Sequence, residues 1–227
     1  MIKLRTTWLA IAVLCSSTAM AQKNELNWTM ERAIDQLAQQ GENFETALAD
    51  VEIDWVNKDG VADKGNSGRI YFNEDGDVRI HITSPTERTV LIEGRDVHIY
   101  DPATATVHEY DRSASSRLEV FTVLGFSVTG EDLEDGYLVT FIGEDEITNR
   151  RVLGLELTPK RDSDRETVSS ITLWIDEASW LPVRQIIEHT PSGQSITTTF
   201  SGTARNLSLN PDLFKDKWPR DTDKVNH

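Results

Sequence analysis

The 227-residue chain carries 38 acidic against 23 basic side chains, which gives a formal net charge of −15 at pH 7. This balance argues against nucleic acids and anionic membrane surfaces as partners, because binding to either needs basic patches that neutralise phosphates. The length fits a single all-β domain, and we interpret the acidic surface as a source of solubility.

The first 21 residues are predicted to be a cleaved signal peptide. Lys3 and Arg5 precede an apolar run, Trp8–Leu14, and Ala19–Ala21 supplies the small residues that a signal peptidase requires. The run is well short of the roughly 20 apolar residues that cross a bilayer. We therefore expect a periplasmic location and one domain over residues 22–227.

The single cysteine, Cys15, lies in the predicted signal peptide. A bacterial lipid-anchor cysteine normally follows a small residue, whereas Leu14 precedes Cys15, so we favour a discarded residue over an anchor. The remaining chain then has neither a disulfide nor a thiol, and its stability must come from its core.

One amphipathic helix is predicted at the start of the domain. Residues 28–39 carry Met30, Ala33, Ile34 and Leu37 at helical spacing, with polar residues between them.

From Ala47 onward the apolar period changes to two, and short polar turns separate eleven strand-like runs. The first series is 47–56, 65–72, 77–83, 88–93, 97–101 and 106–111, and the second is 137–142, 151–159, 168–176, 182–190 and 194–203. Short turns between neighbours predict an antiparallel meander. The tail after it is polar, with Leu213, Phe214 and Trp218 as its only large anchors.

The segment Ser113–Ser127, between the two series, breaks the alternation. Ser116 and Glu119 fit a capping box, which predicts a short helix. Its apolar residues leave hardly any polar face, so it must be covered on more than one side. We expect this helix to act as a lid, with Leu118, Phe121 and Leu124 as its contact residues.

The predicted fold is mainly β: an incomplete antiparallel barrel of about eleven strands covered by helices. Such a barrel is wider than the eight strands whose side chains just fill the middle, so something must occupy the interior. Alternation assigns these residues to the interior as candidate lipid contacts: Ile53, Trp55, Ile70, Phe72, Ile80, Ile82, Val90, Ile92, Ile99, Leu155, Leu157, Leu173, Ile175, Ile187 and Phe200. The alternative is that helices plug the interior and these residues form an ordinary core.

The interior set contains no carboxylates or imidazoles, which argues against a catalytic lumen. No nucleophile elbow, Walker loop or dinucleotide fingerprint occurs in the sequence. We therefore expect no enzymatic activity and no cofactor.

The sequence contains no recognised metal-binding spacing. His81, His98 and His108 match no ligand pattern, and we interpret them as strand histidines that face solvent. The acidic runs 131–135 and 144–146 lack the alternating ligands of a calcium loop and are interpreted as solvated charge.

Several motifs together point to a known family. They are Gly68–Phe72, His81–Pro85, Val90–Gly94 and Val97–Pro102 in the first series, then Leu155–Lys160, Leu173–Asp176, Trp180–Gln185 and Thr197–Phe200 in the second. In their order and spacing the chain resembles the outer-membrane lipoprotein carrier protein family, LolA, over nearly all of residues 28–215.

This resemblance implies an unclosed barrel whose apolar cavity takes the acyl chains of lipoproteins. It implies an acylated lipoprotein or similar lipid as cargo, an inner-membrane lipoprotein-releasing transporter and an outer-membrane receptor as partners, and a monomeric carrier. Two alternatives stay open, namely a lipoprotein-sensing regulator of the same fold and a carrier of another lipid or glycolipid.

One departure concerns the arginine that often holds the lid closed in this family, because the ungapped position here is Glu74. A carboxylate cannot replace the donor fork of a guanidinium. The latch is therefore not carried over, although Arg69 and Arg79 lie nearby in sequence.

Overall fold

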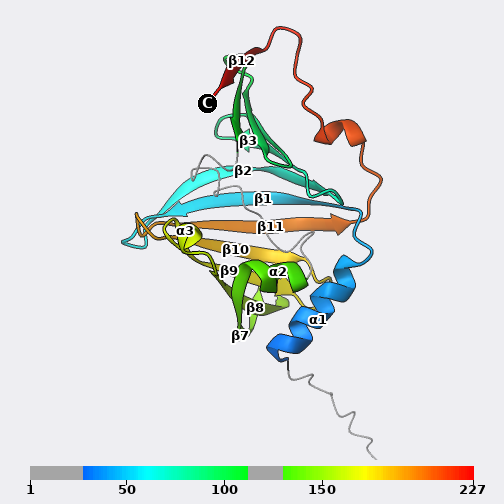
Figure 1. Cartoon of the computed structure of the whole chain (residues 1–227), viewed down its shortest axis with the longest axis vertical. Helices are drawn as coiled ribbons and strands as arrows, with labels where there is room; N and C mark the ends of the chain where they lie inside the picture. Colours follow the sequence, from blue (N-terminus) through cyan, green and yellow to red (C-terminus); the bar gives the residue numbers. More distant parts are fainter. Residues whose placement is uncertain (1–27, 112–129) are drawn as a thin grey trace, which may run out of the picture.

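The computed structural model describes residues 28–111 and 130–227 (Figure 1). The first stretch contains α1 (Met30–Gly41), β1 (Thr46–Val56), β2 (Ala62–Asn73), β3 (Val78–Ser84), β4 (Arg88–Glu93), β5 (Asp96–Asp101) and β6 (Thr106–Asp111). The second contains α2 (Gly130–Gly136), β7 (Tyr137–Ile147), β8 (Arg150–Pro159), α3 (Asp162–Arg165), β9 (Val168–Asp176), β10 (Pro182–His189), β11 (Ser195–Arg205), the 3-10 turn η2 (Pro211–Phe214) and β12 (Asp223–Asn226).

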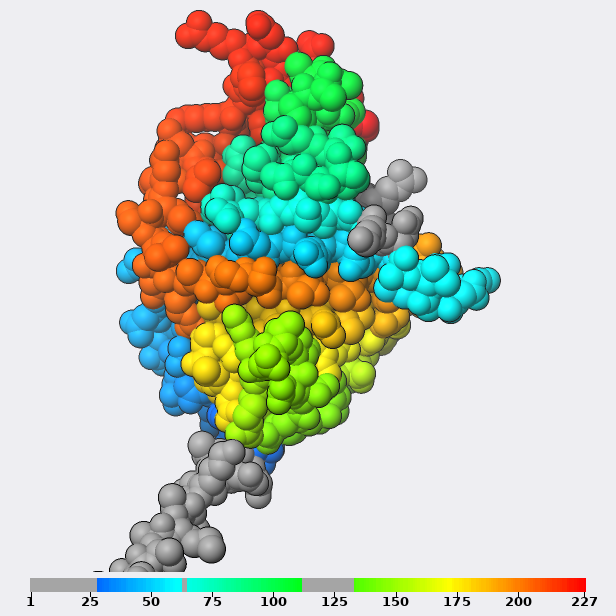
Figure 2. Space-filling model, turned by 180° about the vertical axis from the view of Figure 1, so that it is seen from behind, coloured from blue at the N-terminus to red at the C-terminus, as the bar shows by residue number. Residues whose placement is uncertain are grey.

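The twelve strands form one open, twisted sheet in the order β12-β6-β5-β4-β3-β2-β1-β11-β10-β9-β8-β7. Every pairing is antiparallel except that of β12 with β6, which is parallel. Seen from behind, the colours pass from green through cyan, blue and orange to yellow in the same sequence (Figure 2). The predicted mainly β, unclosed antiparallel fold is confirmed.

The centre of the sheet is the pairing of β1 with β11, which joins two meanders. Val51 lies opposite Phe200, and Ile53 opposite Thr198, residues separated by more than half of the chain. Within each meander, neighbours in sequence are neighbours in the sheet, as the short turns predict. The pairing that joins the meanders depends on a long-range contact that no local pattern indicates.

The amphipathic pattern of residues 28–39 becomes α1. Thr29 caps this helix, because its Oγ1 accepts a hydrogen bond from the Arg32 amide at 3.3 Å. Ala33, Ile34 and Leu37 form its buried stripe. The helix therefore attaches to the sheet through one apolar face.

The pattern does not predict α2, α3 or β12. The run 131–135, interpreted as solvated charge, lies in α2, where Leu133 is fully buried beside exposed Glu134 and Asp135. One apolar residue among acidic neighbours is too weak a signal for a helix. The run 144–146 is exposed as predicted, but it continues β7 as far as Ile147 and pairs with β8.

The segment after β11 runs back beside the first meander to β12 (Figure 1), and on the way η2 contacts β3 and β4. Phe214 is buried, and the Trp218 ring stacks on Tyr100 with 5.1 Å between centroids. Arg79 lies over the same Trp218 ring and donates a hydrogen bond to the Leu213 carbonyl at 2.7 Å. The three large apolar residues of the tail thus lie where it meets the sheet, and β12 then covers the edge of β6.

Gly68 is required by the close approach of β2 to β3. A Cβ at this position would lie 2.0 Å from the His81 carbonyl oxygen and 2.8 Å from the Ile82 Cα. Because these are backbone atoms, Gly68→Ala should lower the free energy of unfolding by about 2 kcal/mol, in the range that overpacking costs. Urea denaturation measures this change.

Gly136→Ala is the matched control, because a Cβ at Gly136 meets nothing within 4 Å. It should lower the free energy of unfolding by no more than about 0.5 kcal/mol. Equal effects of the two substitutions would contradict the tight β2–β3 contact.

Candidate functional site

The interior residues assigned by alternation lie on one face of the sheet, which we call the inner face. All of those on the described strands belong to one of two apolar clusters or pack against one. Trp55 and Ile99 are half-buried, and the others are buried. The structure therefore brings these side chains together, while their contact with lipid stays a prediction.

The first cluster is built almost entirely by strands. Its buried members are Ala47, Ala49, Val51, Ile53, Ile70, Phe72, Val78, Ile80, Ile82, Val90, Ile92, Val97, Leu181, Ile196 and Phe200, and Phe44, Trp55, Ile99 and Tyr110 pack against it. Among the described residues, none of α1, α2 or α3 contributes a side chain to it. This half of the inner face is thus an apolar surface formed by β1–β5 and β11.

The second cluster is covered by helices. It combines Leu153, Leu155, Leu157, Val168, Ile171, Leu173, Ile175, Trp180 and Ile187 with Ala33, Ile34 and Leu37 of α1 and Leu133 of α2. Helix α1 and the start of the second meander lie together in Figure 1. The alternative of an interior plugged by helices therefore applies to the half formed by β8–β10.

A polar pair lies between the two clusters. Gln185 and Thr198 face each other across β10 and β11, with 1% and 7% of their surface exposed. Ile53 flanks Thr198 on one side, and Leu173 flanks Gln185 on the other. Among the buried polar side chains of the described residues, these two alone lie on the inner face, and neither carries a charge.

The predicted lid residues Leu118, Phe121 and Leu124 lie outside the described residues. Glu74, at the position of the family's latch arginine, is exposed in the turn between β2 and β3. Arg69 and Arg79 lie on the opposite, outer face, where Arg69 pairs with Asp50 at 2.7 Å. Neither arginine therefore replaces a latch on the inner face.

Arg205, at the end of β11, fastens α1 to the sheet and was not indicated by the sequence pattern. Its guanidinium donates to the Gln40 carbonyl and side-chain oxygens at 3.3 and 3.0 Å, and to the Ser179 and Trp180 carbonyls at 2.8 and 3.2 Å. Burial lowers the pKa of this guanidinium from its ordinary value. A basic residue at a strand end is common on protein surfaces, so only the fold reveals its role.

The three strand histidines differ in their surroundings. His81 is partly exposed and lies 3.2 Å from Glu87, and His108 lies 2.9 Å from His227. His98 is only 8% exposed, so its interpretation as a solvent-facing residue is wrong, because the tail covers it.

In the described part of the chain, no helix is long and apolar enough to cross a bilayer.

Comparison with known proteins agrees with this geometry. The family model described as outer membrane lipoprotein carrier protein LolA matches residues 51–217. The chain belongs to the LolA family. The resemblance inferred from the sequence motifs is thereby confirmed, and no curated protein sequence matches this LolA-family chain.

Several solved structures are similar to this chain at low sequence identity. An uncharacterized conserved protein from Thermus thermophilus is 12% identical with a TM-score of 0.57, over 88% of this chain and 100% of that one. The lipoprotein LppX of Mycobacterium tuberculosis is 14% identical with a TM-score of 0.48, over 80% and 99%. A putative outer membrane lipoprotein-sorting protein domain from Vibrio parahaemolyticus is 15% identical with a TM-score of 0.44, over 80% and 94%.

The role of Arg205 is testable by hydrogen–deuterium exchange. Arg205→Gln removes the charged donors that hold Gln40, so amides of α1 should exchange about tenfold faster, as expected for losing a charged hydrogen bond. Arg69→Gln, which breaks only an exposed pair on the outer face, should leave exchange in α1 unchanged. Unaltered exchange in Arg205→Gln would contradict the fastening role.

Proposed function

We propose that this LolA-family protein is a periplasmic carrier that shields the acyl chains of lipoproteins, or of a similar multi-acyl lipid, during transfer from the inner to the outer membrane. The observation that supports it best is the first cluster. It offers a continuous apolar surface across six strands, and none of its described members carries a charge. The proposed role involves binding and release and no catalysis.

The energy of exposed acyl chains explains why such a surface is needed. Each methylene left in water costs about 0.8 kcal/mol, so three chains of roughly 16 carbons would cost on the order of 30 kcal/mol. Non-directional apolar contacts, as the first cluster provides, suit chains that bear no polar groups. A catalytic site would instead need nucleophilic or titratable groups at fixed positions.

Release requires that the cover of the first cluster be reversible. The second cluster is filled by side chains of α1 and α2, whereas the described helices leave the first cluster to the strands. We propose that the acyl chains lie against the first cluster and that the segment Ser113–Ser127 covers them there. The chains would then compete with lid residues for the same apolar surface.

The partners follow from this role. Cargo would arrive from an inner-membrane lipoprotein-releasing transporter and leave to an outer-membrane receptor, with the protein acting as a monomer.

The Gln185–Thr198 pair supplies neutral hydrogen-bonding groups beside the apolar surface, which suits the ester or amide that joins an acyl chain to its head group.

Cargo identity is tested by extracting the protein after its purification from periplasm under detergent-free conditions. Mass spectrometry of the organic extract should show diacylated or triacylated peptides at a substantial fraction of one per chain. Glycolipid alone would contradict lipoprotein as the cargo, and an extract without any lipid would contradict the carrier function.

The site of binding is tested by placing a charge beside the first cluster. Trp55→Asp introduces a carboxylate at a half-buried position on this cluster. An acyl chain that binds there would remove water from the carboxylate, and this costs free energy. Binding of a fluorescent triacylated lipopeptide should weaken at least about tenfold, the order expected for burying an unpaired polar group.

Phe121→Asp in the predicted lid should abolish uptake while leaving the sheet folded.

Val61→Asp is the matched control, because Val61 lies in the turn between β1 and β2 and is 62% exposed. It should bind the lipopeptide as the unaltered protein does. Circular dichroism establishes that all variants are folded. Equal binding by Trp55→Asp and Val61→Asp would place the lipid elsewhere.

A further inference from the structure

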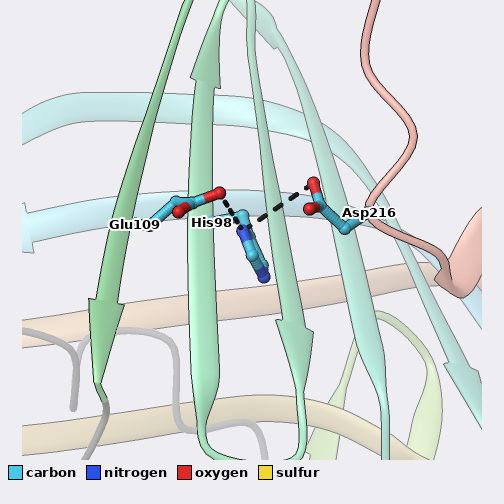
Figure 3. Close-up of side chains that lie close together, drawn as sticks. All are labelled: His98, Glu109 and Asp216. Carbon is cyan, nitrogen blue, oxygen red and sulfur yellow. Dashed lines mark ion pairs between the residues drawn. The ribbon is translucent and has the colours of Figure 1, made fainter. Parts of the chain in front are cut away.

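A compact set of potential metal-ligating side chains lies on the outer face, on the opposite side of the sheet from the proposed lipid surface. His98 of β5, Glu109 of β6 and Asp216 of the tail point toward one another (Figure 3). One ligand atom of each lies within 4.8 Å of the other two. These residues come from three different elements, so their grouping exists only in the folded chain.

The geometry of His98 needs an explanation. Its Nδ1 is buried and has no hydrogen-bond partner. The nearest carboxylate oxygens, Glu109 Oε1 and Asp216 Oδ1, lie 3.6 and 3.9 Å away. These separations exceed the roughly 2.7–3.2 Å of N–H···O hydrogen bonds, and a buried unpaired nitrogen is costly.

The distances from His98 Nδ1 to the two carboxylate oxygens are close to those between the ligands of a small cation. A tetrahedral ion with nitrogen and oxygen ligands at about 2.0–2.2 Å holds those ligands about 3.3–3.5 Å apart. The observed 3.6 and 3.9 Å differ from this by only a few tenths of an ångström. Because the three ligand atoms all lie within 4.8 Å of one another, an inward shift of the exposed tail would complete the three-ligand set.

We propose that His98, Glu109 and Asp216 bind a divalent transition-metal ion of the Zn²⁺ class. One imidazole with two carboxylates is a donor set that suits zinc, whereas calcium and magnesium prefer oxygen ligands alone. A fourth position is left for water. Because Asp216 belongs to the tail and His98 to the sheet, the ion joins the two.

Lys224 already neutralises both carboxylates and is the competitor of the ion. Its Nζ lies 2.7 Å from Glu109 Oε1 and 2.8 Å from Asp216 Oδ2. The lysine side chain is half exposed, so its ammonium can move into solvent when the ion binds. The ammonium leaves His98 Nδ1 without a partner, and a metal ion supplies one.

Calorimetric titration of the untagged protein with ZnCl₂ at neutral pH tests the site. One ion should bind per chain, and His98→Gln and Asp216→Asn should each weaken binding at least about tenfold, as removal of a ligand does. Lys224→Met should tighten binding severalfold, because it removes the competing charge. Zinc should also slow hydrogen–deuterium exchange in residues 215–226.

The control is His108→Gln, which removes one imidazole of the separate His108–His227 pair. This variant should bind zinc as the unaltered protein does. Loss of binding in His108→Gln with retention in His98→Gln would overturn the proposed site, as would the absence of saturable binding. Weaker binding in folded Lys224→Met than in the unaltered protein would also overturn it, because the lysine would then support the site.

Discussion

The pairing of β1 with β11 is the contact on which the architecture depends. It joins two meanders whose free edges, β6 with β12 and β7, lie at opposite ends of one sheet. Without it, the apolar sides of the meanders would be two separate surfaces. With it, a single row runs across the centre from Ile53 through Thr198 and Gln185 to Leu173, and both clusters share one inner face.

The two halves of that face are built differently, and the difference suits the proposed carrier function. The half formed by β8–β10 is closed by α1 and by Leu133. Arg205 donates to two oxygens of Gln40 in α1 and to the Ser179 and Trp180 carbonyls between β9 and β10. The half formed by β1–β5 and β11 takes no side chain from the described helices. In the proposed carrier, the helix-covered half would keep the sheet folded while the first cluster takes up cargo, because apolar contacts are non-directional.

Local pattern predicted the strands well because the period of two is visible within each of them. The run from Val51 to Trp55 alternates in sequence as it does in the sheet, and a Gly-containing turn follows it. The same logic could not reach Leu133, whose burial depends on α1, or the parallel contact of β12 with β6. The surroundings of His98 were also out of reach, since Asp216 is more than a hundred residues away in sequence.

The sheet is a single layer, so its two faces are linked through the backbone of each strand. In β5, Val97 and Ile99 point toward the first cluster, while His98 and Tyr100 point toward the tail. Trp218 and Asp216 thus contact residues that alternate with the members of the inner face. An edge strand tends to fray and to pair with foreign strands, and β12 opposes both at β6. A cation that ties Asp216 to His98 would therefore stiffen the strands that form one wall of the proposed lipid surface, without occupying that surface.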